Sequence, residues 1–180
     1  MLRVRARLSS AVERSALALG WLRADRLRQW ETCERLIFVC SGNICRSPYA
    51  QEAARRHGLA AVSCGTHTRN GLPANDSAVR EAAQRGVDLS AHETTRWEDL
   101  KIEKGDVIVG MQLQHALAVL PRARGEAFPV VVFSSLLPSF TTVWDPYGKP
   151  AEQFHQVFNL IDTGIARIAH LHAPGGVERK

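Results

Sequence analysis

The sequence has few cysteines and no long apolar run. Its 180 residues include four cysteines, which are too few for the disulfide framework of a small secreted protein. Nowhere does an apolar stretch approach the ~20 residues that a membrane-spanning helix requires. There is also no internal repeat and no low-complexity segment. These absences argue against disulfide scaffolds, membrane-spanning proteins and repeat proteins, and we expect a single globular domain in the cytoplasm.

The formal net charge of +5 is unevenly distributed. Residues 1–35 hold eight arginines and four acidic residues, a balance of +4, so the rest of the chain carries only +1. The basic character therefore says little about the rest of the chain and does not by itself indicate a nucleic-acid partner. We predict that no nucleic acid is bound.

Residues 1–35 are predicted to form a basic N-terminal extension, ahead of a domain over residues 36–172 and a tail over residues 173–180. Apolar residues in the extension recur loosely at the spacing of one helical face, which is compatible with an amphipathic helix. Such a helix could pack on the domain, on a partner or on a membrane surface. A tail without fixed structure, a misplaced translation start and a mitochondrial presequence stay open as alternatives.

Strand-like and helical segments alternate along the rest of the chain. This alternation predicts an α/β fold in which a central four-stranded, parallel, twisted sheet carries helices on both faces, with the N-terminal helical extension added. Ligands of such sheets bind beyond the carboxyl ends of the strands. The expected strands are residues 36–40, 61–64, 106–110 and 129–133, and the expected helices are residues 47–57, 76–85, 114–120 and 152–170, with a short one near 97–100.

One stretch, residues 36–48, carries most of the chemical information. An apolar strand ends at Cys40, a short loop follows, and Arg46 comes six residues after the cysteine. Gly42 and Asn43 are residue types that tolerate unusual backbone angles, which a tight loop with inward-facing amides requires. The stretch therefore predicts a nest of N–H groups that binds a tetrahedral anion.

The helix start behind this loop supports the same interpretation. Ser47 is a favourable N-cap, and Pro48 would occupy the first helical position. A helix N-terminus and a neighbouring cation both favour the thiolate form of a cysteine, and Arg46 can clamp two phosphate oxygens at once. A buried cysteine at a strand end, beside an incidental arginine, is the plainer reading. It leaves the Gly-Asn and Ser-Pro matches unexplained.

The loop sequence, CSGNICRSP, resembles the signature of the low-molecular-weight protein tyrosine phosphatases. Residues 144–147 are similar to the family's Asp-Pro-Tyr loop, and the segments 63–67, 71–74 and 86–92 resemble family segments in the same order. Two departures stand out. Cys64 replaces a commoner alanine, and Gln112 stands where the family often has aspartate. We expect both departures to affect local packing rather than activity.

The resemblance implies a role for each residue of the site. Cys40 would attack the phosphorus to form a phosphocysteine, Arg46 would bind the phosphoryl oxygens, and Asp145 would act as general acid and then as general base. No metal and no organic cofactor are expected. The implied partner is a phosphotyrosine-containing protein, with autophosphorylating tyrosine kinases among the candidates. The residues expected to contact the substrate or shape its loop are Ser41, Gly42, Asn43, Ile44, Cys45, Ser47 and Tyr147, with His67 at the pocket mouth.

Three other functions share parts of this pattern. Protein arginine phosphatases typically carry threonine where this chain has Ile44, and thiol-dependent arsenate reductases use further cysteines downstream, whereas none follows Cys64. A phosphotyrosine-binding module without activity could lose the nucleophile or the acid, and both are present here. Because Ile44 and Tyr147 suit a flat aromatic ring, the sequence favours a tyrosine phosphatase.

Cys45 lies close enough in sequence to Cys40 to serve as a resolving thiol. Oxidation of Cys40 would then be trapped as a Cys40–Cys45 disulfide, which protects the nucleophile from overoxidation. Cys33 and Cys64 are expected to be structural. A zinc site that uses these cysteines is disfavoured, because Cys-x4-Cys without a second regular pair is poor metal spacing.

Overall fold

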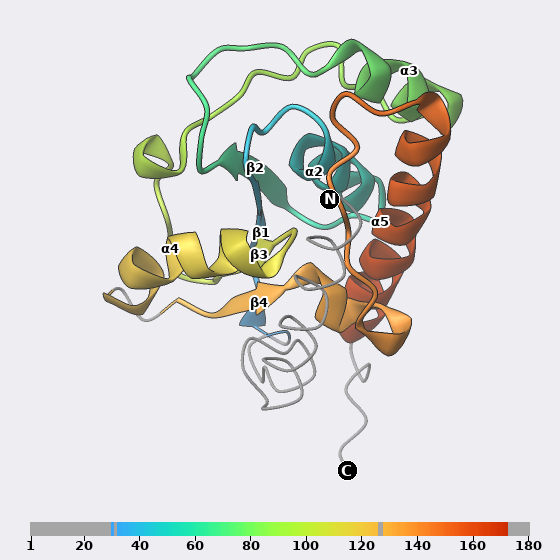
Figure 1. Ribbon diagram of the computed structural model, residues 1–180. Helices are drawn as coiled ribbons and strands as arrows, with labels where there is room; N and C mark the ends of the chain where they lie inside the picture. Colours follow the sequence, from blue (N-terminus) through green and yellow to red (C-terminus); the bar gives the residue numbers. More distant parts are fainter. Residues whose placement is uncertain (1–29, 31, 126–127, 173–180) are drawn as a thin grey trace, which may run out of the picture.

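Four parallel strands form one sheet at the centre of the fold (Figure 1). The computed structural model describes Trp30, residues 32–125 and residues 128–172. In this part of the chain the α/β fold and the four-stranded parallel sheet predicted from the sequence are confirmed. The strands are β1 (Arg35–Cys40), β2 (Ala61–Gly65), β3 (Asp106–Gly110) and β4 (Val130–Val132), in the order β2-β1-β3-β4.

Strand β1 lies inside the sheet, with β2 on one side and β3 on the other. Val39 is paired with Cys64 of β2 on one side and with Gly110 of β3 on the other. The residues of β1 after Arg35 are all buried, as is typical of a parallel strand covered on both faces. Because the strand order reverses direction beside β1, its carboxyl end lies at the topological switch point, where α/β sheets bind ligands. Cys40 is the last residue of that strand.

Helices cover both faces of the sheet (Figure 1). Two of them, α2 (Arg46–Arg56) and α5 (Ala151–His172), pack together on one face, and α3 (Asp76–Gln84) packs beside α5. The other face carries α4 (Leu113–Gly125) and the short 3-10 helix η3 (Trp97–Asp99). Two further 3-10 helices, η4 (Phe133–Leu136) and η5 (Pro138–Phe140), lead from β4 toward the segment before α5.

Helix α2 begins one residue earlier than expected. Its N-cap is Cys45, Arg46 is the first helical residue, and no side chain caps the end. The expectation that Ser47 is the N-cap is therefore wrong, because its hydroxyl lies against Cys40 and Asn43 instead. Pro48 becomes the third helical residue, where its missing N–H is still harmless since the first turn makes no intrahelical N–H bonds.

Helix α4 continues through Pro121 to Gly125, beyond the end expected at residue 120. A proline inside a helix removes one backbone hydrogen bond and normally ends the helix before it. Here Val119 and Ala123, on either side of Pro121, are both fully buried in the cluster on this face of the sheet. Tertiary packing therefore outweighs the local preference.

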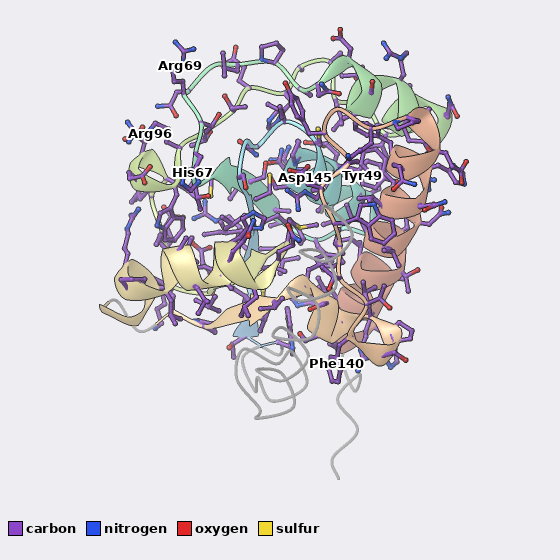
Figure 2. The ribbon with its side chains drawn as sticks, viewed as in Figure 1. Tyr49, His67, Arg69, Arg96, Phe140 and Asp145 are labelled. Atoms are coloured by element: carbon purple, nitrogen blue, oxygen red, sulfur yellow. The ribbon has the colours of Figure 1, made fainter. Side chains whose placement is uncertain are left out.

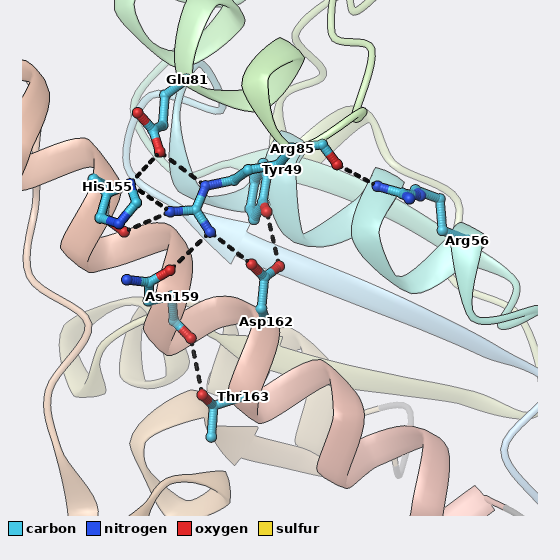
Figure 3. A network of polar contacts seen from close by, with 8 residues as sticks. All are labelled: Tyr49, Arg56, Glu81, Arg85, His155, Asn159, Asp162 and Thr163. Atoms are coloured by element: carbon cyan, nitrogen blue, oxygen red, sulfur yellow. Dashed lines mark hydrogen bonds and ion pairs between the residues drawn. The ribbon is translucent and has the colours of Figure 1, made fainter.

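A polar network ties α2, α3 and α5 together (Figure 3). The guanidinium of Arg85, just after α3, contacts the carboxylates of Glu81 and Asp162 at 2.8 Å and 2.9 Å and the Asn159 side chain at 2.9 Å. The Tyr49 hydroxyl of α2 donates to Asp162 at 2.7 Å. Burial and the neighbouring Asp162 raise the pKa of Tyr49 above its usual range, so the phenol remains a hydrogen-bond donor. The network fixes the helix that follows the Cys40 loop.

The packed core begins before β1. Trp30 is only 1% exposed, and its carbonyl oxygen lies 3.2 Å from Nδ1 of His172 at the end of α5. Cys33 is also buried, which raises the pKa of its thiol to about 11. Residues 1–29 and 173–180 lie outside the described part, so the expected extension helix and the boundaries at 35/36 and 172/173 stay predictions.

Candidate active site

The sulfur of Cys40 lies at the end of β1 under two hydrogen-bond donors. The backbone N–H of Asn43 donates to Sγ at 3.2 Å, and Oγ of Ser47 lies 3.0 Å from it. The Ser47 hydroxyl also accepts a bond from the Asn43 side chain at 2.9 Å, and its proton can go to the sulfur at 3.0 Å or to the Cys64 carbonyl oxygen at 3.4 Å. Both groups are therefore placed to hydrogen-bond the sulfur.

Asn43 holds the loop in shape. It takes a left-handed backbone conformation with φ of 54°, which Asn adopts more readily than most residues. Its side-chain amide donates to Ser63 Oγ at 2.8 Å as well as to Ser47, and its Oδ1 accepts the N–H of Thr95 at 2.9 Å. His92 donates to its carbonyl oxygen at 2.7 Å. Of the two residues that tolerate unusual backbone angles, Asn43 thus has a positive φ and Gly42 does not.

Several donors of the loop have no acceptor among the described residues. The N–H groups of Gly42, Ile44 and Cys45 make no such hydrogen bond, and the buried Nε of Arg46 has no partner either. These residues line a cavity of about 230 Å³. A buried donor without an acceptor, such as Nε of Arg46, is rare in proteins, so the arrangement fits a bound oxyanion. The cavity is lined by Cys40, Ser41, Gly42, Ile44, Cys45, Arg46, His67, Asp145 and Tyr147.

Arg46 is almost fully buried and has two side-chain partners. Its Nη2 lies 3.0 Å from Oδ2 of Asp145, and its Nη1 donates to Oε1 of Gln112 at 2.7 Å. Gln112 thus contacts the guanidinium of a predicted site residue, and the expectation that it affects packing rather than activity stays a prediction. Cys64 agrees better with that expectation, because it packs in the apolar cluster on the face of α4.

Asp145 and Tyr147 lie at the rim of the cavity. The Asp145 side chain is half exposed, and its Oδ1 accepts the N–H of Tyr147 at 3.3 Å. Tyr147 is 60% exposed. His67 lines the same cavity, as expected for a residue at its mouth, and lies just beyond the end of β2 (Figure 2). Cys40 and Asp145, 105 positions apart in the sequence, thus face one cavity.

Some of the predicted site residues line the cavity, and others lie behind the loop and hold its conformation. Asn43 and Ser47 are fully buried and lie behind the loop, where they hold it rather than face the cavity. The sequence analysis gave no site role to Gln112, which lies just before α4 and contacts Arg46, or to His115, which lies in the first turn of α4 and contacts Ser41. Their position at the carboxyl end of a neighbouring parallel strand is the signal that could have found them.

The structure bears on the predicted Cys40–Cys45 disulfide and on the arrangement of possible metal ligands. Cys40 and Cys45 are both free thiols, and burial together with the nearby Cys40 raises the pKa of the Cys45 thiol far above its usual range. A Cys40–Cys45 disulfide stays a prediction, and this burial would slow the attack of Cys45 at neutral pH. Within the described ranges, no group of three or more His, Cys, Asp or Glu side chains is arranged to hold a metal ion.

A parallel α/β sheet whose central strand ends in a cysteine, inside a loop of unpaired N–H groups and an arginine, defines an oxyanion-binding cysteine enzyme. The chain belongs to the family described as low molecular weight phosphotyrosine protein phosphatase, which it matches over residues 35–173. It is therefore a phosphatase.

Named relatives and solved structures agree with this family. A probable low molecular weight protein-tyrosine-phosphatase, EpsP of Ralstonia nicotianae, is 30% identical over 135 residues, which cover 72% of this chain and 90% of the relative. The tyrosine phosphatase Wzb of Escherichia coli K30, solved with sulphate, superposes with a TM-score of 0.66 at 27% identity, covering 76% of this chain and 96% of that one. A protein-arginine-phosphatase of Geobacillus stearothermophilus is 27% identical over 141 residues, or 75% of this chain and 93% of the relative.

Proposed function

We propose that this protein hydrolyses phosphotyrosine in proteins through a phosphocysteine on Cys40. The observation that carries the proposal is the single cavity shared by the Cys40 sulfur, the unpaired donors of the loop and Arg46, with Asp145 at its rim. A nucleophile, an oxyanion cradle and a proton donor are the three parts that phosphomonoester cleavage needs.

In the first step the Cys40 sulfur attacks the phosphorus in line. The bond between phosphorus and the phenolic oxygen breaks while Asp145 gives that oxygen a proton. Arg46 and the N–H groups of the loop stabilise the equatorial oxygens, where negative charge is held in the transition state. The products of this step are the free phenol and the phosphocysteine.

In the second step water attacks the phosphocysteine. Asp145, now a carboxylate, takes a proton from the attacking water, and the phosphorus–sulfur bond breaks to release inorganic phosphate. The sulfur leaves as a thiolate, which the Ser47 hydroxyl and the N–H of Asn43 stabilise at 3.0 Å and 3.2 Å. The enzyme thereby returns to its starting form.

The walls of the cavity favour an aromatic phosphoester. Ile44 and Tyr147 both line it, one from the loop and one from the rim. An apolar side chain and an exposed aromatic ring can enclose a phenyl ring, and the Ile44 side chain offers no acceptor for a guanidinium. This is why we favour phosphotyrosine over phosphoarginine, although an arginine phosphatase is among the relatives.

The protein partner is proposed on family grounds. Relatives named tyrosine phosphatases support a phosphotyrosine-containing protein, and an autophosphorylating tyrosine kinase is the candidate that the family resemblance suggests. In the described part of the chain no helix is both long enough and apolar enough to cross a bilayer. A reactive thiolate requires a reducing compartment, so we propose the cytoplasm as the site of action.

Three substrates assayed side by side test the proposal: para-nitrophenyl phosphate, a phosphotyrosine peptide and phosphoarginine. We expect the two aryl phosphates to be hydrolysed, with phosphoarginine at least about tenfold slower in kcat/KM, which is what one changed pocket wall contributes. Ile44→Thr, which removes the apolar wall, should narrow this difference. A protein that prefers phosphoarginine would contradict the assignment, and one that hydrolyses none of the three would contradict the phosphatase function.

A further inference from the structure

His115 contacts the phosphate loop from behind, and the mechanism above leaves it unused. It is the third residue of α4 and is almost fully buried. Its Nε2 lies 2.9 Å from Oγ of Ser41, the residue that follows the nucleophile. Its Nδ1 accepts the backbone N–H of Gln112 at 3.1 Å. The ring is therefore held between a backbone donor on one side and a serine hydroxyl on the other.

These contacts determine where the ring proton lies. Nδ1 accepts a hydrogen bond, so it carries no proton of its own. Burial, helped by the neighbouring Arg46, lowers the pKa of His115 to about 3, so the ring is neutral near pH 7. The one ring proton is thus on Nε2. The Gln114 amide lies 3.5 Å from Nε2, a longer contact than the one to Ser41.

The position of that proton sets the direction of the Ser41 hydroxyl. Nε2–H donates to Oγ of Ser41, so the Ser41 hydroxyl cannot donate its own proton to His115. Among the described residues Ser41 Oγ has no other hydrogen-bond partner. We propose that His115 is a positioning residue that turns the hydroxyl proton of Ser41 into the cavity, where it donates to an oxygen of the bound phosphoryl group.

The direction of the Ser41 hydroxyl matters because the phosphoryl group is a dianion, which attracts a hydroxyl proton and repels oxygen lone pairs. With the opposite tautomer, Ser41 would donate to His115 and present only lone pairs to the phosphoryl oxygens. With the observed contacts, the Ser41 hydroxyl donates a charge-assisted hydrogen bond to the phosphoryl group, in addition to the hydrogen bonds from the loop N–H groups and Arg46. Charge-assisted hydrogen bonds are stronger than neutral ones. Gln112, just before α4, contacts Arg46 through its side chain at 2.7 Å. The start of α4 and the residue before it thus contact two groups that face the phosphate.

The proposal rests on the phosphatase function, and a matched pair of variants tests it apart from that function. Ser41→Thr keeps the hydroxyl and Ser41→Val has nearly the same shape without it. The dissociation constant of inorganic phosphate is measured by calorimetry on the full chain, beside kcat and KM for para-nitrophenyl phosphate. We expect Val to weaken phosphate binding about tenfold or more relative to Thr, the loss of one hydrogen bond to a charged group. Equal affinities for the two variants would overturn the proposal.

A second pair tests the role of His115. The side-chain amide of Gln can reach the place of Nε2 and donate to Ser41, whereas Asn can only replace the contact of Nδ1 with Gln112. We expect His115→Gln to restore phosphate affinity that His115→Asn loses, and Ser41→Val combined with His115→Asn to be no worse than Ser41→Val alone. Independent losses that add in the double variant would contradict the positioning role.

The controls separate the possible failures. Leu117→Ala, on an exposed part of α4, should leave phosphate affinity unchanged. Thermal denaturation shows whether each variant folds, and if His115→Asn does not fold, the comparison of Ser41→Thr with Ser41→Val decides. A wild-type protein that binds phosphate but hydrolyses no aryl phosphate would contradict the phosphatase function alone. A wild-type protein that binds no phosphate would contradict both proposals.

Discussion

At the scale of single residues, replacing the sulfur of Cys40 tests catalytic turnover separately from phosphate binding. In Cys40→Ser the loop donors and Arg46 remain, but the hydroxyl is a far weaker nucleophile than a thiolate. We predict that turnover of para-nitrophenyl phosphate falls by at least about 10⁴-fold, as for other lost nucleophiles, while phosphate still binds. Steady-state kinetics and calorimetry measure the two effects. Residual turnover near that of the wild type would remove Cys40 from the nucleophilic role.

Asp145 should matter most for substrates with poor leaving groups. We predict that Asp145→Ala slows phenyl phosphate by about 10²-fold or more, the usual contribution of a general acid, and slows para-nitrophenyl phosphate far less because its phenolate leaves without a proton. Removing the carboxylate also frees Nη2 of Arg46 from its contact at 3.0 Å, so phosphate affinity should not fall. Equal losses for the two substrates would exclude Asp145 as the acid.

His115 should make the folded protein sensitive to acid. Burial lowers its pKa to about 3 in the folded chain, against about 6.5 in an unfolded one. Between these two values the unfolded chain binds a proton that the folded chain does not. The free energy of unfolding therefore falls as pH decreases from about 6.5 toward about 3, by at most about 1.4 kcal/mol per pH unit from this residue.

Denaturant titrations of wild type and His115→Gln at several pH values between 7.5 and 4 measure that contribution. The variant should show a shallower slope of unfolding free energy against pH below 6.5. Some slope will remain, because burial also lowers the pKa of His92. Parallel curves for wild type and variant would show that His115 does not contribute.

The local signature made part of this site predictable and left another part hidden. Cys40 and Arg46 are six positions apart, and the loop between them has a composition with a physical meaning of its own, so both could be assigned from the sequence. Asp145 was found by resemblance, since an Asp-Pro pair alone is usually a turn. Gln112 and His115 were not assigned to the site, because their contacts depend on which strand lies next to β1 in the sheet.

At the scale of helices and strands, local preferences gave the elements but not all of their ends. The strand over residues 106–110 coincides with β3, and the other strands agree to within a residue at each end. The start of α2 was missed because Ser47 has a better partner in Cys40 than in the helix terminus. The end of α4 was missed because burial of Val119 and Ala123 outweighs Pro121. Each error arose where tertiary contacts compete with a capping or helix-breaking preference.

The Arg85 network should stabilise the helical face behind the active site. Arg85→Ala would leave the buried Glu81 with only its contact to His155 at 3.0 Å and would remove a partner of Asp162. We predict a loss of about 2 kcal/mol in the free energy of unfolding, below the usual cost of breaking a fully buried pair because Asp162 is partly exposed. This corresponds to a fall of about 4–8 °C in Tm for a chain of this size.

Arg56→Ala is the matched control for this network. Arg56 is exposed and donates at 2.7 Å only to the backbone carbonyl oxygen of Arg85 (Figure 3), so its loss should cost no more than about 0.5 kcal/mol. Calorimetric unfolding of the three proteins gives the comparison. Equal effects of the two substitutions would show that the Arg85 ion pairs contribute nothing beyond an exposed contact.

At the scale of the whole molecule, the active site depends on both layers of helices. The face of α2 and α5 supplies the helix that follows the loop, and the face of α4 supplies the turn that holds Arg46 and Ser41. Asp145 comes from the segment that precedes α5. The carboxyl end of β1 is the place where all three meet, which follows from the strand order and explains why one short loop cannot form this site alone.

Two deletions test where the independently stable unit begins. Removing residues 1–34 takes away Trp30, which is 1% exposed and packs near Ile168 and His172 at the end of α5. Losing a buried tryptophan typically costs about 3–5 kcal/mol. Removing only residues 1–29 keeps Trp30 and every residue of the active site. We predict that the shorter deletion preserves kcat/KM for para-nitrophenyl phosphate and stability, whereas the longer one lowers Tm by roughly 6–20 °C.

The same shorter deletion tests the predicted role of the basic extension. Residues 1–29 hold seven of the eight arginines in residues 1–35, and each basic residue near an anionic membrane contributes about 1 kcal/mol of attraction. We predict that the full chain cosediments with vesicles containing phosphatidylserine and that the 1–29 deletion does not, with neutral phosphatidylcholine vesicles as the control. If both proteins bind the anionic vesicles equally, the attraction comes from the catalytic domain. If neither binds, the membrane-surface prediction is wrong.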